Sequence, residues 1–143
     1  MSADKPVQIL CYGDSNTGGT IGEWVKPTLP TKRYAPENRW PCVLQERLGA
    51  KVNVIAEGLG GRTTIYKRYG EEWKCGETYL LPCLRSHRPL DLVIIMLGTN
   101  DLQVKKDITA DVPLKILLVM YCRMEKKCII PKSFRLLLIS RTE

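Results

Sequence analysis

Three apolar segments each run into a polar turn that contains glycine, and this repeated pattern constrains the fold most. Nearly continuous apolar runs of five to seven residues are typical of strands that are covered on both faces, as in parallel sheets. Helical patterns separate the runs, and the order strand, helix, strand, helix, strand predicts a doubly wound parallel sheet. We therefore expect an α/β protein with three layers, α/β/α. The runs cover residues 7–12, 52–56 and 91–97, and their turns cover residues 13–17, 57–64 and 98–101.

Two helices are expected between the strands. Residues 39–48 place four apolar side chains on one face, with Asn38 as the cap, Pro41 in the first turn and Gly49 as the stop. Residues 78–87 predict a second, short helix that is interrupted at Pro82. The apolar side chains on the face of the first helix are Trp40, Val43, Leu44 and Leu48.

The carboxyl ends of parallel strands meet at one edge of a sheet, where open α/β sheets place their chemistry. We therefore expect Ser15, Gly61 and Asn100 to converge there. Ser15 either only caps a helix, or presents an exposed hydroxyl near the positive end of a helix dipole. In the second case Ser15 Oγ could attack a carbonyl carbon. The backbone N–H groups of Ser15 and Gly61 and the amide of Asn100 could then surround the developing oxyanion.

Size and charge exclude several classes of function. The 143 residues suffice for one domain. The excess positive charge lies in the tail, with 9 Lys and Arg against 4 Asp and Glu in residues 104–143, but 13 against 11 in residues 1–103. No dense basic run or recognition motif accompanies it, so we expect no nucleic-acid partner. A polar start and apolar runs too short to span a bilayer favour the cytoplasm and no membrane partner.

The sequence predicts neither a metal site nor a cofactor in this fold. The six cysteines are scattered without any C-x-x-C pair, and His87 is the single histidine. Because His87 stands just before Pro89 at the end of an element, a structural role is favoured for it.

A flavodoxin-like alternative comes from the stretch Ser15–Thr20. It fits the S-x-T-G-x-T pattern of a phosphate loop after a first strand, which would cradle the phosphate of FMN. This FMN-binding module would leave the turns at Gly61 and Asn100 without a role.

The three turns together resemble blocks one, two and three of the SGNH (GDSL-type) hydrolases, most of all the bacterial arylesterase/acyltransferase branch. The resemblance covers about residues 7–103 and includes two linking segments. It implies a serine esterase acting on carboxylic esters of small or aryl alcohols, with Ser15 as the nucleophile and an acyl-enzyme at Ser15. It also implies that Ser15, Gly61 and Asn100 line the oxyanion hole. The segments are Gly13–Thr17, Glu57–Thr64 and Gly98–Asp101, with Arg33–Trp40 and Tyr79–Leu84 between them.

The C-terminal part departs from that family. Its fourth block, an Asp-x-x-His that supplies the base, is absent, so we expect weak or no activity with the small-molecule ester substrate. We expect a hydrolase-like domain over residues 1–119, with a helix start at 108–112 and a fourth strand at 115–119. A divergent basic tail follows over residues 120–143. Truncation or a shifted reading frame is the favoured origin of the tail, and a genuine C-terminus with an edge strand at 133–139 is the alternative. A sheet left partly uncovered would favour a homo-oligomer.

Overall fold

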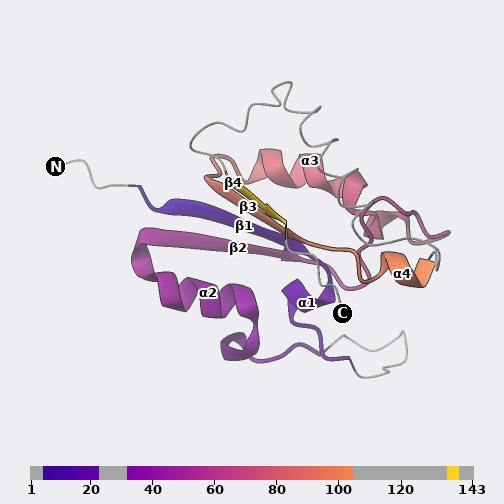
Figure 1. Ribbon diagram of the computed structural model, residues 1–143, viewed down its shortest axis with the longest axis horizontal. Coiled ribbons are helices and arrows are strands. Elements are labelled where there is room, and N and C mark those ends of the chain that lie inside the picture. The colour runs from indigo at the N-terminus through magenta and orange to yellow at the C-terminus, as the bar shows by residue number, and fades with distance from the viewer. Residues whose placement is uncertain (1–4, 23–31, 105–134, 139–143) are drawn as a thin grey trace.

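The computed structural model describes residues 5–22, 32–104 and 135–138, the last of these as backbone only. Four parallel strands form one sheet in the order β2-β1-β3-β4 (Figure 1). The first strand in the chain therefore lies inside the sheet and β2 lies at one edge. The strands are β1 (Val7–Gly13), β2 (Val52–Gly58), β3 (Leu92–Met96) and β4 (Arg135–Leu138).

Helices cover both faces of this sheet, which confirms the three-layer prediction (Figure 1). On one face, Ile9, Cys11 and Ile94 pack with Trp40 and Leu44 of α2. On the other face, a larger core formed by the alternate strand residues packs under α3. The helices among the described residues are α1 (Ser15–Gly18), α2 (Trp40–Leu48), α3 (Gly76–Ser86) and α4 (Asp101–Val104). The same ranges contain the short 3₁₀ turns η1 (Pro36–Asn38), η2 (Gly49–Lys51) and η3 (Glu72–Lys74).

The start and the apolar face of α2 differ from the prediction. Asn38 is not its cap, because Asn38 belongs to η1 and Arg39 occupies the cap position without a side-chain bond. Leu48 is 42% exposed, because the helix ends there and Gly49 turns the chain away with a φ of 69°. Pro41 in the first turn and Gly49 as the stop are confirmed.

The predicted interruption of the second helix at Pro82 is wrong. Helix α3 runs without a break from Gly76 to Ser86 with Pro82 inside it. Pro82 is exposed, so the hydrogen bond that its ring nitrogen cannot donate is lost on the solvent side. Leu80, Cys83 and Leu84 are buried on the opposite side and hold the helix against the sheet.

Part of the C-terminal prediction falls outside the described residues, namely the helix start at 108–112, the strand at 115–119 and the boundary at residue 119. The strand of the alternative interpretation does form, because β4 lies within residues 133–139 and pairs with β3. Within the described ranges, no helix combines the length and the apolar character needed to cross a membrane.

Candidate active site

Ser15 is the first residue of α1, directly after the carboxyl end of β1. The cap of this helix is Asp14, whose carboxylate accepts the backbone N–H of Asn16 at 2.9 Å. The interpretation of Ser15 as a cap is therefore wrong. The expected help from a helix dipole is small, because α1 has only four residues.

Gly13 is needed for packing. It is the last residue of β1, and a Cβ there would lie 2.0 Å from Thr17 Oγ1 and 2.8 Å from the carbonyl oxygen of Met96. No side chain larger than hydrogen fits at this position. The turn is thereby pressed against the end of β3.

A cavity of about 400 Å³ lies beside Ser15. Apolar groups of Trp40, Met96 and Leu97 contribute to its wall, so it suits a small ligand with an apolar part. Ser15 Oγ makes no hydrogen bond to any residue that the structure describes. The lining consists of Ser15, Asn16, Gly19, Thr20, Tyr34, Asn38, Trp40, Met96, Leu97 and Thr99.

Asn100 brings the three turns together. It is 8% exposed, and its Nδ2 donates to the carbonyl oxygen of Arg62 at 3.1 Å and to Asp14 Oδ2 at 3.4 Å. Asn100 thus contacts the residue before Ser15 and the residue after Gly61. Both hydrogens of its amide have acceptors within the protein in this arrangement.

Gly61 occupies the second turn with a φ of 76°, a backbone conformation that favours glycine. The side chain of Lys74 covers it, at 3.2 Å from the position that a Cβ would take. The N–H of Gly61 donates to no acceptor in the described parts of the chain. Gly61 follows β2 at the same edge of the sheet, but neither Gly61 nor Asn100 is among the residues that line the cavity beside Ser15.

Arg62 is a buried residue that the sequence reasoning missed. It is 3% exposed, and its guanidinium donates to the carbonyl oxygens of Gly13 at 3.0 Å and Glu57 at 2.6 Å. The same group lies over the ring of Tyr12, 4.2 Å from the centroid. Arg62 therefore ties the ends of β1 and β2 together directly below the Ser15 turn.

The carboxylate of Asp101 holds the second turn. It accepts the backbone N–H of Thr64 at 3.0 Å and the hydroxyl of Thr64 at 2.6 Å. A threonine in the second block and an aspartate in the third were visible in the sequence, but no spacing rule pairs them.

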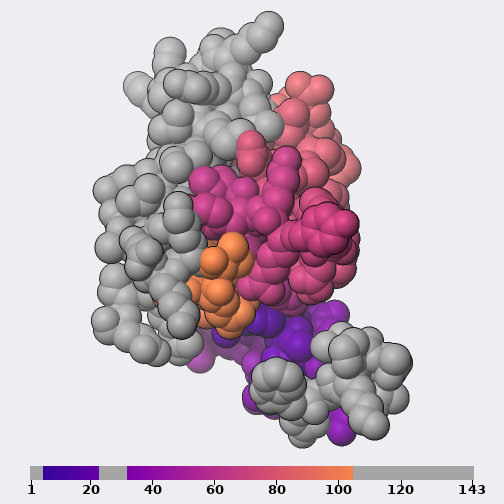
Figure 2. All heavy atoms as spheres, turned by 90° about the vertical axis from the view of Figure 1, so that its right-hand side faces the viewer, coloured from indigo at the N-terminus to yellow at the C-terminus, as the bar shows by residue number. Residues whose placement is uncertain are grey.

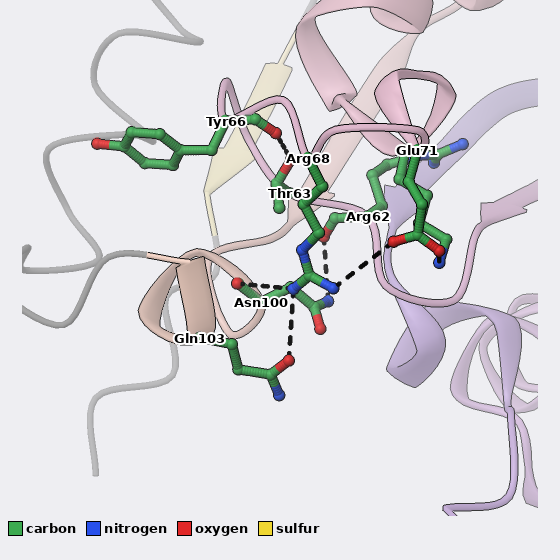
Figure 3. Close-up of polar contacts among 8 residues, drawn as sticks. Arg62, Thr63, Tyr66, Arg68, Glu71, Asn100 and Gln103 are labelled. Carbon is green, nitrogen blue, oxygen red and sulfur yellow. Dashed lines mark hydrogen bonds and ion pairs between the residues drawn. The ribbon is translucent and has the colours of Figure 1, made fainter.

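The loop after Gly61 is also tied to the third turn (Figure 3). The Arg68 guanidinium donates to the carbonyl oxygen of Asn100 at 3.3 Å and to Gln103 Oε1 at 3.4 Å, and it pairs with Glu71. Figure 2 looks onto this edge of the sheet, where α4 lies between the loop of residues 58–75 and α1.

The two buried carboxylates of the site, Asp14 and Asp101, have a raised pKa. Burial raises the pKa of Asp14, and the hydrogen bonds from Asn16 and the charge of Arg62 oppose this increase only in part. Burial likewise raises the pKa of Asp101 against the hydrogen bonds from Thr64. Both acids are held for positioning, since their oxygens are occupied by donors from the neighbouring turns.

His87 does not contact Ser15. His87 lies at the end of α3, and its Nε2 is 2.8 Å from Oε1 of Glu57 on β2. Neither residue lines the cavity beside Ser15. The structural role expected for His87 agrees with this pairing. Within the described residues, no imidazole is therefore in place to take the proton of Ser15.

Comparison with known proteins decides the family. The sequence pattern of the GDSL-like Lipase/Acylhydrolase family matches residues 11–123, which include all three turns. The chain belongs to this family. The expected SGNH resemblance is confirmed, and nothing in the comparisons supports the FMN-binding alternative.

Solved structures of esterases share the fold of this GDSL-like chain. The native M. smegmatis aryl esterase is 38% identical, with a TM-score of 0.77 over 94% of this chain. A carbohydrate acetylesterase from Sinorhizobium meliloti is 37% identical, with the same TM-score and coverage. The chain spans 63% and 64% of the length of these two proteins. No curated protein matches.

Proposed function

We propose that this chain carries the nucleophile and the oxyanion donors of a serine esterase that acts on carboxylic esters of small or aryl alcohols. The observation that carries the proposal is the Ser15 hydroxyl, which lies without a hydrogen-bond partner among the described residues beside a cavity of about 400 Å³. The likeness to an aryl esterase and a carbohydrate acetylesterase supports the ester class.

The chemistry follows from the positions of the donors. Ser15 Oγ attacks the carbonyl carbon of the ester, its proton passes to a base, and the C–O bond to the alcohol breaks to leave an acyl-enzyme. Water then releases the acid and restores Ser15. The carbonyl oxygen becomes negative during each attack, and N–H groups placed around it stabilise that charge.

The proposal assigns three donors at this edge of the sheet to the oxyanion. The N–H groups of Ser15 and Gly61 donate to no acceptor within the described ranges. Asn100 can give up its longer hydrogen bond, the one of 3.4 Å to Asp14, and keep the one to Arg62 while it donates to the oxyanion. Each such donor contributes about 3–4 kcal/mol to stabilising the transition state in well-studied hydrolases.

The base is the missing part. The sequence contains no Asp-x-x-His, and His87 is engaged by Glu57. Hydrolases without members of their triad retain about 10³–10⁴-fold acceleration over water from the oxyanion hole and substrate binding. We therefore expect slow ester hydrolysis that still depends on Ser15.

Hydrolysis of p-nitrophenyl acetate tests the proposal. The unaltered chain should turn over slowly and Ser15→Ala should reduce its rate to that of buffer. Ser86→Ala is the control, because Ser86 lies on α3 and its hydroxyl donates to the carbonyl oxygen of Cys83 at 3.0 Å. A rate that is equal in the Ser15→Ala variant and the unaltered chain would contradict a nucleophilic Ser15. Fast turnover would show that a base is present after all.

A further inference from the structure

A second group of chemically active side chains lies on the α3 face of the sheet. Glu57 stands near the end of edge strand β2, Cys83 stands on the last turn of α3, and His87 follows that helix directly as its C-cap. One ligand atom from each of the three lies within 4.8 Å of the others. None of the three lines the cavity beside Ser15.

The backbone explains why Cys83 and His87 meet. His87 is the residue that caps the C-terminal end of α3, and its N–H donates to the carbonyl oxygen of Cys83 at 3.2 Å, which sets it one turn after Cys83. Residues four apart in a helix share one face, so the thiol and the imidazole point the same way. Glu57 faces them because it pairs in register with Tyr12, which belongs to the core under α3.

We propose that Glu57, Cys83 and His87 form a binding site for a divalent transition-metal ion of the zinc type. A carboxylate, a thiolate and an imidazole are the ligands that such ions prefer, and three protein ligands leave a fourth position for water. This site departs from the expectation that the sequence holds no metal site. Sequence spacing gave no sign of it, because Glu57 and Cys83 are 26 positions apart and no C-x-x-C is present.

The geometry requires only small shifts. Metal–ligand bonds of about 2.0–2.3 Å in a tetrahedral site set neighbouring ligand atoms about 3.3–3.6 Å apart. Glu57 Oε1 and His87 Nε2 now lie 2.8 Å apart and would separate slightly. The sulfur, within 4.8 Å of both, would move toward them.

Access and charge also suit an ion. The side chains of His87 and Glu57 are 29% and 23% exposed, so an ion can enter from their side, whereas Cys83 is fully buried. On binding, the Cys83 thiol loses its proton to solvent, and the thiolate and the carboxylate together balance the 2+ charge of the ion.

Titration with Co²⁺ tests the site directly, since a cobalt–thiolate bond has its own charge-transfer absorption in the near ultraviolet. The unaltered chain should show this band and saturate at one ion per chain, and Zn²⁺ should abolish it by displacement. Cys83→Ser should lose the band. Glu57→Gln and His87→Gln should weaken the Co²⁺ affinity at least about tenfold.

Two controls separate this site from other thiols. Cys42→Ser removes a half-buried cysteine of α2, and the double variant Cys122→Ser/Cys128→Ser removes the two cysteines of the tail. Both should keep the band. If Cys83→Ser fails to fold by circular dichroism, the two variants of the partly exposed ligands decide the outcome. Absence of the band, its loss in a control, or unchanged affinity in both Glu57→Gln and His87→Gln would overturn the proposal.

Discussion

The Ser15 turn and the polar residues packed behind it have opposite characters. Ser15 is partly exposed beside a cavity, and its hydroxyl has no partner in the described parts of the chain. Behind it lies a group that we call the polar layer, in which every member is at most 8% exposed and bonded to another turn. The polar layer consists of Asp14, Arg62, Thr64, Asn100 and Asp101.

This difference shows how the site divides its tasks. Ser15, the proposed nucleophile, has no competing hydrogen bond among the described residues, and its position is fixed by neighbours whose movement would break buried hydrogen bonds. A buried polar group that loses its partner costs about 1–3 kcal/mol, so the polar layer links the three strand ends energetically. Changes in the polar layer should therefore cost stability, whereas changes at Ser15 should cost reactivity alone.

Arg62→Met should have the largest effect on stability. It removes the guanidinium donor from the carbonyl oxygens of Gly13 and Glu57, of which Gly13 keeps the N–H of Leu59, and it removes the cation from the face of Tyr12. We expect a loss of about 3–4 kcal/mol in the free energy of unfolding, measured by urea denaturation. Ser15→Ala is the matched comparison and should lose less than about 0.5 kcal/mol. Similar losses in the two variants would remove the distinction between turn and polar layer.

Gly58→Ala should disturb the packing of the Ser15 turn against β2. A Cβ at Gly58 would lie 2.1 Å from the backbone nitrogen of Gly18, so α1 must move away from β2. We expect a loss of about 2–3 kcal/mol in thermal or urea unfolding. Gly60→Ala is the control, because the nearest atom to its new Cβ is Thr20 Oγ1 at 3.9 Å. Equal costs for both alanines would mean that the close approach of Gly18 and Gly58 does not matter.

Thr64→Val should have a smaller effect. It removes the hydroxyl that donates to Asp101 and leaves the backbone N–H of Thr64 in place, so the carboxylate keeps one of these two donors. We expect a loss of about 1–2 kcal/mol in the free energy of unfolding. An unchanged midpoint of denaturation would show that Asp101 does not hold the second turn through this hydroxyl.

The pH dependence of Asp14→Asn should show the smallest effect. Because burial raises the pKa of Asp14 above its usual 3.8, the folded state binds this proton more tightly than the unfolded state. The contribution of Asp14 to stability is therefore present below 3.8 and declines as the pH rises through the folded pKa. Relative to the asparagine variant, the unaltered chain should lose stability from pH 3.8 toward neutrality. A difference that stays constant or reverses over that window would contradict the raised pKa.

The sequence predicted the framework because apolar runs and turns act locally. The strands at residues 7–12, 52–56 and 91–97 and the meeting of their turns follow from hydrophobic pattern and chain order. The unbroken α3 was missed, because burial of Leu80 and Leu84 outweighs the lost hydrogen bond at Pro82. Whether burial outweighs a lost hydrogen bond depends on how the core is packed, which the local sequence pattern does not show.

The polar layer was missed for a different reason. Arg62 bonds a carbonyl 49 positions away, and Asp101 bonds Thr64 37 positions away. Nothing in the spacing of an arginine, a threonine and an aspartate specifies such pairs. The catalytic roles of Ser15, Gly61 and Asn100 remain predictions that rest on their shared edge of the sheet and on the family.

Labelling with a fluorophosphonate tests the central claim most directly, namely that Ser15 is a free nucleophile held by a fixed polar layer. Peptide mapping by mass spectrometry should find one phosphonate adduct, on Ser15, formed slowly because no imidazole among the described residues lies beside Ser15. The adduct should be absent in Ser15→Ala, retained in Ser86→Ala, and reduced in Gly58→Ala, in which α1 is displaced. An unmodified Ser15, or adducts spread evenly over other serines such as Ser86, would contradict the account.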